Sequence, residues 1–273
     1  MTLTAALIQL RTPASQPAAL DQAAPLIRQA VAGGATLIVT PEGSNLLQRK
    51  RADLFAALAP METDHAVVGY RALAGELGVW LLVGSAMVLR TDGKAANRSI
   101  LIDPHGGVAA TYDKLHMFDV DLPTGERHRE SAVYEPGDKA VVAPVDGAVL
   151  GLTICYDLRF PALHRALACA GAQVLTVPSA FTRPTGVAHW EVLLRARAIE
   201  TGSFVLAAAQ GGVHEDGRQT WGHSMAISPW GEIIAMADHD EPCVVFATLD
   251  LARVGQARCA IPALANARAF AAP

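Results

Sequence analysis

Three side chains capable of acid–base or nucleophilic chemistry each follow a predicted β-strand. Glu42 follows the apolar strand 36–40, Lys114 follows strand 108–110, and Cys155 ends the apolar segment 149–154. In open α/β sheets, reactive groups collect just beyond the carboxyl ends of strands. A carboxylate can act there as a general base, a thiolate as a nucleophile, and an ammonium group as a fixed cation beside a reacting carbonyl.

Cys155 has the most informative local context. An apolar strand leads into it, and a helix is predicted to begin near Pro161. This strand-to-helix turn is similar to a nucleophile elbow, where backbone N–H groups are available to an oxyanion. The alternative is a small buried core cysteine, a common fate of cytosolic cysteines. The nearby charges of Asp157 and Arg159 argue against a purely apolar setting.

The acidic residues and the lysine have less specific contexts. A proline before Glu42 and a glycine after it hold this carboxylate at a strand end. Partial burial there is expected to raise its pKa toward that of a general base. An exposed loop glutamate is the alternative, and a lysine between an aspartate and a histidine, as at Lys114, is usually a solvated loop residue. Glu130 lies in the charged run 126–130, a pattern typical of a solvated face.

The elements that position these residues follow an α/β pattern, in which short apolar strands alternate with helical stretches. Apolar side chains at helical spacing predict a helix over 18–32, which Gly33 and Gly34 would end. Strands are predicted at 7–10, 36–40, 80–83, 149–154, 174–177, 204–208 and 244–249.

A weak internal repeat also runs through the chain. Residues 34–41 are similar to 171–178, residues 78–83 to 202–207, and residues 102–106 to 227–231. The three matches keep the same order along the chain. They indicate two similar halves that face each other across one core, or else only the local features that αβ units share.

Composition excludes several classes of protein. The chain has 273 residues, a formal net charge of −4 and 18% charged residues, which disfavours a nucleic-acid or anionic-membrane partner. The low charge also fits apolar surface buried between subunits. No apolar stretch reaches the length of a membrane span, and no secretory signal is apparent.

The cysteines and one asparagine bear on the cellular compartment. The four cysteines form no C-x-x-C pair and have no zinc-site spacing with histidine, so a reducing, cytoplasmic location is expected. Residues 97–99 match a glycosylation sequon, which has no meaning without secretion.

Together these segments resemble the nitrilase, or carbon–nitrogen hydrolase, superfamily, whose mark is a Glu, a Lys and a Cys in that chain order. Here these are Glu42, Lys114 within 112–116, and Cys155 within 154–161. Glu130 matches an additional active-site glutamate. Segments 178–181, 188–201, 207–210 and 222–225 are most similar to the branch of deaminated-glutathione amidases and ω-amidases. Residues 183–184 depart from that branch's pattern.

The resemblance implies an α/β fold, a four-layer α-β-β-α sandwich with internal pseudo-two-fold symmetry, as one domain over residues 1–273. It also implies a homodimer or higher homo-oligomer. No metal or organic cofactor is implied.

The resemblance further assigns roles to residues. Glu42 is the expected base, Cys155 the nucleophile and Lys114 the oxyanion-binding cation, and Glu130 would position Lys114 or the substrate. The expected substrate-binding residues are Tyr156, Phe181, Arg183 and Trp190. Arg183, which lies where the chain departs from the branch's pattern, is either a reader of a substrate carboxylate by bidentate pairing or a surface arginine.

The implied reaction is hydrolysis of a primary amide of a small carboxylated substrate to the acid and ammonia through a thioester. Cleavage of an N-carbamoyl substrate, another acyl transfer on the same thioester, and a catalytically idle scaffold are the alternatives. A Cys–His pair is a weaker alternative, because none of the nine histidines lies in a local cysteine-protease signature.

Overall fold

Two six-stranded β-sheets form the centre of the computed structural model, which describes residues 1–122 and 125–271. Sheet 1 has the strand order β16 (Cys243–Asp250), β1 (Thr2–Gln9), β2 (Leu37–Val39), β3 (Trp80–Leu89), β4 (Ala95–Ile102) and β5 (Val108–Asp113). Sheet 2 has the order β8 (Val141–Val145), β9 (Ala148–Leu152), β10 (Val174–Thr176), β11 (Phe204–Ala207), β14 (Met225–Ile227) and β15 (Ile233–Met236).

The two sheets have the same pairing pattern strand for strand. In sheet 1, β1, β2 and β3 are parallel, and the flanking β16, β4 and β5 are antiparallel to their neighbours. In sheet 2, β9, β10 and β11 are parallel, and β8, β14 and β15 pair in the antiparallel sense. The three sequence matches fall on equivalent elements: the first contains β2 and β10, the second the start of β3 and the whole of β11, and the third the turns after β4 and β14. The pseudo-symmetry is therefore a property of the topology.

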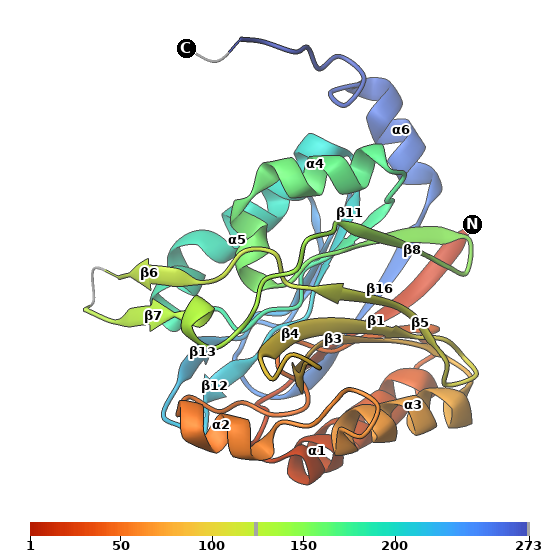
Figure 1. Ribbon diagram of the computed structural model, residues 1–273. Helices are drawn as coiled ribbons and strands as arrows, with labels where there is room; N and C mark the ends of the chain where they lie inside the picture. The colour runs from red at the N-terminus through yellow and green to blue at the C-terminus, as the bar shows by residue number, and fades with distance from the viewer. Residues whose placement is uncertain (123–124, 272–273) are drawn as a thin grey trace.

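Helices cover the outer faces of both sheets, so the layers run helix, sheet, sheet, helix (Figure 1). Helices α1 (Gln16–Ala32) and α3 (His65–Leu77) pack on sheet 1, and α4 (Pro161–Cys169) and α5 (Arg183–Thr201) pack on sheet 2. One hydrophobic cluster lies between the sheets and extends beneath α4 and α5, and a second lies between sheet 1 and its helices. The expected four-layer sandwich is confirmed.

The remaining elements lie at the edges of the layers. They are α2 (Arg51–Ala57), α6 (Ala252–Ala260), the hairpins β6–β7 (Asp119–Asp121, Arg127–Arg129) and β12–β13 (Gly211–Val213, Gln219–Trp221), and the 3₁₀ turns η1 (Glu130–Ala132) and η2 (Cys155–Arg159). Within residues 1–122 and 125–271, none of the helices has the length and apolar character needed to cross a bilayer.

The predicted elements agree with the structure in type, and their bounds differ by a few residues. The helix predicted over 18–32 is α1, which begins at Gln16 with a proline in its first turn and ends at Ala32, with Gly33 as its C-cap. The short strands of sheet 2 beyond β11, and helix α3, lacked a clear signal in the sequence. Their register comes from packing against neighbours, which a local pattern does not encode.

Gly84 lies where the two sheets approach each other beside Glu42. A Cβ atom at this position would lie 1.9 Å from the Thr40 carbonyl oxygen and 2.4 Å from Cβ of Pro178. The Gly84 N–H donates to Thr40 Oγ1 at 3.1 Å, so the glycine also fixes the end of β2. The absence of a side chain at this position therefore allows the segment after β2 to approach the end of β10.

Replacing Gly84 with alanine is expected to lower the free energy of unfolding by about 1–3 kcal/mol, because the methyl group overlaps backbone atoms that have no room to move. Gly255→Ala is the matched control. Gly255 lies inside α6 with open space around it, so alanine there should be neutral or stabilising by up to about 1 kcal/mol. Urea denaturation of the two variants and the parent measures the difference. Equal stability of Gly84→Ala and the parent would contradict the close approach.

Candidate active site

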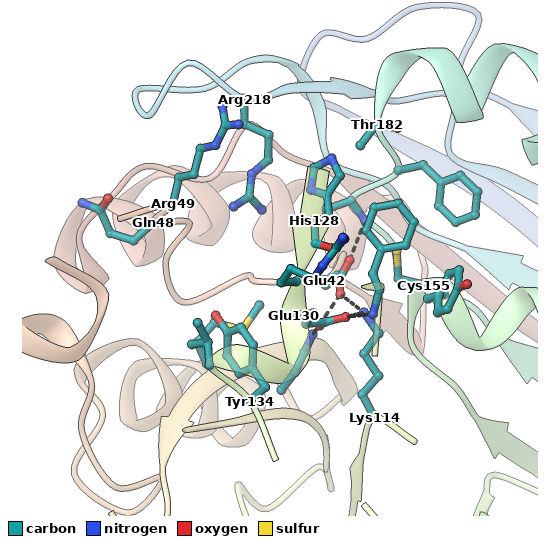
Figure 2. Close-up of a pocket in the computed structure, with 18 of the residues that line it drawn as sticks. Glu42, Gln48, Arg49, Lys114, His128, Glu130, Tyr134, Cys155, Thr182 and Arg218 are labelled. Atoms are coloured by element: carbon teal, nitrogen blue, oxygen red, sulfur yellow. Dashed lines mark hydrogen bonds and ion pairs between the residues drawn. The ribbon is translucent and has the colours of Figure 1, made fainter. Parts of the chain in front are cut away.

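Four side chains predicted from the sequence converge on one cavity (Figure 2). Glu42 follows β2 and Lys114 follows β5, both in sheet 1. Cys155 follows β9 of sheet 2 and begins η2, whereas Glu130 begins η1 after the β6–β7 hairpin. All four line the same cavity. Strand ends from both halves of the molecule therefore supply the site.

The backbone at Cys155 has the strained geometry of a nucleophile elbow. Its φ angle is +49°, a value that residues other than glycine rarely adopt. The Cys155 N–H donates to the Pro178 carbonyl at 2.9 Å, which anchors the turn to the end of β10. Helix α4 begins at Pro161, as predicted. The thiol is buried, with the residue 8% exposed, yet it faces the cavity.

Lys114 is the centre of a buried ion-pair cluster. Its Nζ donates to Glu42 Oε1 at 3.0 Å and to both carboxylate oxygens of Glu130 at 2.9 Å. Only 2% of the Lys114 side chain is exposed. Nδ2 of Asn97, in β4, bridges the two carboxylates by donating to Glu42 Oε1 at 2.8 Å and to Glu130 Oε1 at 3.3 Å. Burial of these charges is tolerated because each is paired and hydrogen-bonded.

Backbone N–H groups also donate to the two carboxylates. Ala180 N–H donates to Glu42 Oε2 at 2.9 Å, and Phe118 N–H donates to Glu130 Oε2 at 2.6 Å. Ala180 belongs to the segment after β10 in sheet 2, so Glu42 is held from both halves of the molecule. Glu130 is therefore part of the buried cluster and does not lie on the solvated face that the charged run 126–130 suggested.

The cluster sets the protonation states of its members. Burial alone would lower the pKa of Lys114, but the Glu130 and Glu42 carboxylates raise it well above its ordinary value. Burial acts to raise the pKa of Glu42, but the Lys114 charge and hydrogen bonds from Cys155, Lys114 and Asn97 hold it below its usual range. The expectation of a raised pKa for Glu42 was wrong in direction, because the nearby ammonium outweighs burial.

The thiol is protonated in the resting site. Burial and the Glu42 charge raise the pKa of Cys155 well above its ordinary value, against a lowering by Lys114. One ammonium and two carboxylates already leave the cluster with a net charge of −1, so a thiolate would add a second uncompensated negative charge. The site therefore combines a thiol with an adjacent ionised carboxylate that can accept its proton.

Asp157 connects the lysine loop to the nucleophile turn. Its carboxylate is fully buried and accepts hydrogen bonds from Tyr112 OH at 2.7 Å and Ile154 N–H at 2.9 Å. It also accepts from His116 N–H at 3.1 Å and contacts His116 Nδ1 at 2.7 Å. Tyr112 and His116 flank Lys114, so one carboxylate positions both the cation and the turn that carries the thiol.

The cavity has a volume of about 300 Å³, within the range of small-molecule sites. Tyr156 and Phe181, two of the expected substrate-binding residues, lie in its wall. The Tyr156 ring makes edge contacts with Phe118 and Phe160, which fix its orientation. In the part of the chain that the structure describes, no group of three His, Cys, Asp or Glu side chains is arranged to hold a metal ion.

The structure does not bring Arg183 or Trp190 into the cavity wall. Arg183 begins α5, is half exposed and pairs with Asp240 at 3.0 Å outside the cavity wall, as the alternative of a surface arginine predicts. Trp190 is buried behind the wall, where it packs against Phe181 and donates its Nε1–H to the His223 carbonyl. Trp190 thus supports the wall from the α5 side and does not face a ligand.

Sequence reasoning missed several residues of the site. Asn97 was noticed only as a sequon, although its side chain joins both carboxylates of the cluster. Arg49 and Arg218 line the cavity from segments that carried no motif signal. Arg159, four residues after the nucleophile, also lines the cavity, whereas Arg183 does not. Its place in the segment 154–161 was the available signal.

Comparison with known proteins agrees with this geometry. The family model described as carbon-nitrogen hydrolase matches residues 4–259. The chain is 45% identical over 205 residues to a deaminated glutathione amidase of Yersinia enterocolitica, covering 74% of this chain and 71% of the relative. It is 40% identical over 264 residues to a deaminated glutathione amidase of Synechocystis sp., covering 95% and 96%.

Solved structures show the same fold. The crystal structure of the C. elegans NitFhit protein superposes with a TM-score of 0.91 at 34% identity, covering 98% of this chain and 65% of that chain.

Removing the charge of Glu42 is expected to make Cys155 ionise more readily while abolishing most catalysis. In Glu42→Gln, the negative charge that raises the thiol pKa is lost and Lys114 remains, so the pH profile of Cys155 alkylation should move to lower pH. Amide hydrolysis should fall about 100-fold or more, because the proton acceptor is gone. Iodoacetamide labelling, followed by mass spectrometry of the peptide containing Cys155, measures the profile.

Glu135→Gln is the control for this experiment, since Glu135 pairs with Lys94 at the surface and does not line the cavity. Its labelling profile should match that of the parent. A profile in Glu42→Gln that is unchanged or moved to higher pH would refute the assigned coupling between carboxylate and thiol.

Proposed function

The chain belongs to the carbon–nitrogen hydrolase family and is a hydrolase of C–N bonds other than peptide bonds, and from this premise we propose that it cleaves an amide of a small carboxylated substrate through a thioester on Cys155. The observation that carries the proposal is the convergence of a thiol, an ionised carboxylate and a buried ammonium group in one cavity. These are the groups that acyl transfer requires.

Formation of the thioester begins with proton transfer from Cys155 to Glu42. The thiolate attacks the amide carbonyl carbon, and the resulting oxyanion is stabilised by the Lys114 ammonium and the backbone N–H of Tyr156. Tyr156 lies in the first turn of η2, where backbone N–H groups have no intrahelical partner. Loss of one such donor typically costs about 3 kcal/mol of transition-state stabilisation.

The raised pKa of the thiol fits a transfer that is coupled to attack. A free thiolate would add to the negative charge of the cluster, whereas attack moves that charge onto the carbonyl oxygen near Lys114. The substrate thus makes ionisation favourable when it is in place. Glu130, bonded to Lys114 through both oxygens, keeps the ammonium aimed at the oxyanion.

Breakdown of the thioester uses the same carboxylate in the reverse sense. Glu42 gives its proton to the departing nitrogen as the C–N bond breaks, which leaves an acyl group on Cys155. Glu42 then takes a proton from water, and the resulting hydroxide attacks the thioester carbon. The acid is released and the thiolate recovers its proton from Glu42, so protons balance over the cycle.

A guanidinium beside the nucleophile supports the carboxylated substrate. Arg159 is held over the Phe181 and Tyr156 rings at 5.5 and 6.0 Å, and its NH2 contacts His189 Nδ1. Among the described residues, no carboxylate lies within ion-pair distance of Arg159. We assign to it the reading of a substrate carboxylate once expected of Arg183, with Tyr156 and Phe181 as the apolar walls.

Assembly and location complete the proposal. Helix α5 presents Val187, Val192 and Ile199 more than half exposed, and Trp230 is similarly exposed, which supports pairing of two copies into a homodimer. Residues 1–273 are proposed to form a single domain. Four thiols are unpaired in the described structure, in keeping with the reducing cytoplasm.

Cys155→Ala and Cys155→Ser are both expected to lose at least about 1,000-fold in turnover, because neither side chain forms the thioester at this site. The assay panel holds an α-keto-ω-amide, whose hydrolysis releases ammonia, and deaminated glutathione, whose amides are secondary and release an amine. Cys169→Ser, at an exposed surface position, serves as the control. Retained turnover in both Cys155 variants would overturn the nucleophile assignment, and carbon dioxide among the products would indicate carbamoyl cleavage.

A further inference from the structure

The cavity carries far more positive than negative charge. Seven of its lining residues are Lys or Arg and two are Glu. Lys114 is paired with both glutamates, and Arg127 and Arg129 are paired with Asp121. Several guanidinium groups remain to face the cavity with little or no compensation from the protein. Such a surplus is a physical basis for binding an anionic ligand.

Arg49 and Arg218 stand apart from Arg159 within this surplus. Figure 2 draws both on the side of the view away from Cys155. Arg49 comes from the segment after β2, and Arg218 from the turn between β12 and β13. Arg159 lies in the turn after the nucleophile, against the Tyr156 ring. The cavity therefore presents guanidinium groups in two places.

Arg218 is held in place but only weakly neutralised. The Arg218 N–H donates to Asp216 Oδ1 at 2.9 Å, and its carbonyl accepts from His214 N–H, which fixes the turn. Its guanidinium approaches Asp216 Oδ2 at 3.6 Å, and that oxygen has no hydrogen-bond partner. Arg218 and Tyr134 both line the cavity; burial raises the pKa of Tyr134, and the nearby Arg218 charge opposes this rise.

Arg49 has no acidic partner within ion-pair distance in residues 1–122 and 125–271. It is exposed at the cavity mouth, next to Gln48, which also lines the cavity. An exposed arginine alone contributes little to binding, but two guanidinium groups that flank one mouth can hold a carboxylate between them.

We propose that Arg49 and Arg218 form a second carboxylate subsite, remote from Cys155, that selects substrates with two carboxylates. The proposal rests on the proposed amidase function and adds to it. A substrate then spans the cavity with one carboxylate at Arg159, the scissile amide at Cys155, and the other carboxylate at Arg49 and Arg218. Such a substrate is a secondary amide whose leaving amine is itself a carboxylic acid.

This geometry distinguishes two types of amide. A primary amide such as 2-oxoglutaramate has one carboxylate and releases ammonia, so it leaves the second subsite empty. Deaminated glutathione carries a keto-acid carboxylate on the acyl side and a glycine carboxylate on the amine side, and it fills both. Binding energy from the remote carboxylate holds the amide at the thiol.

The test compares deaminated glutathione with its glycine methyl ester, which lacks only the second charge. For the parent enzyme, kcat/KM is expected to fall about tenfold on esterification, mainly through KM. Arg49→Gln and Arg218→Gln should each lose a similar factor on the diacid and almost nothing on the ester or on 2-oxoglutaramate. Arg183→Gln, outside the cavity, is the matched control and should behave as the parent on all three.

Equal kcat/KM for acid and ester, or equal losses on both in the arginine variants, would overturn the subsite. Calorimetric binding to Cys155→Ala separates this outcome from failure of the proposed function, because binding needs no turnover. Tighter binding of the diacid than of the ester, lost in Arg49→Gln/Arg218→Gln, supports the subsite even if the parent hydrolyses none of these amides. Hydrolysis without any such binding difference leaves the amidase function intact and refutes the subsite.

Discussion

The buried pairing of Lys114 with two carboxylates is the interaction on which the site depends. An ammonium and two carboxylates removed from water are tolerated only when every charge has a partner. Removing one partner of a buried pair typically costs about 3–5 kcal/mol of stability. Here each carboxylate accepts from Lys114, from Asn97 and from a backbone N–H. The cluster therefore requires that several distant segments be placed correctly at once.

The paired sheets meet that requirement. Parallel strands end at a common edge, so the loops after β2 and β9 bring a carboxylate and a thiol together from opposite sheets. The small residue at Gly84 lets those loops approach, and the end of β10 contributes N–H or carbonyl groups to both Glu42 and Cys155. The candidate active site is thus formed at the boundary between the two halves of the molecule.

The surroundings of Cys155 also explain why its thiol stays protonated until a substrate is bound. Burial and the negative charge of Glu42 together hold the pKa of Cys155 high, against the opposing charge of Lys114. When a substrate carbonyl lies beside Lys114, negative charge on its oxygen is stabilised better than negative charge on the sulfur. In the proposed reaction the arginines of the cavity act on a different step, since a surplus of positive charge attracts and orients an anionic ligand before the thiol ionises.

The sequence by itself determined the type of most elements and three of the four cluster residues. Apolar strands ending in Glu42, Lys114 and Cys155 are local features, and hydrophobic periodicity is a local signal. The family resemblance added Glu130, which its charged neighbours had placed on a solvated face.

Only the tertiary structure decided which arginine faces the cavity, how Asn97 bridges the glutamates, and that the pKa of Glu42 is lowered. Each of these depends on distances between residues far apart in the chain. In the sequence, Arg183 and Arg159 are both plausible residues to bind a substrate carboxylate. In the structure, Arg183 at the start of α5 pairs with Asp240, whereas Arg159 at the end of η2 lines the cavity. Electrostatic shifts follow burial and neighbouring charge, and neither exists until the sheets have packed.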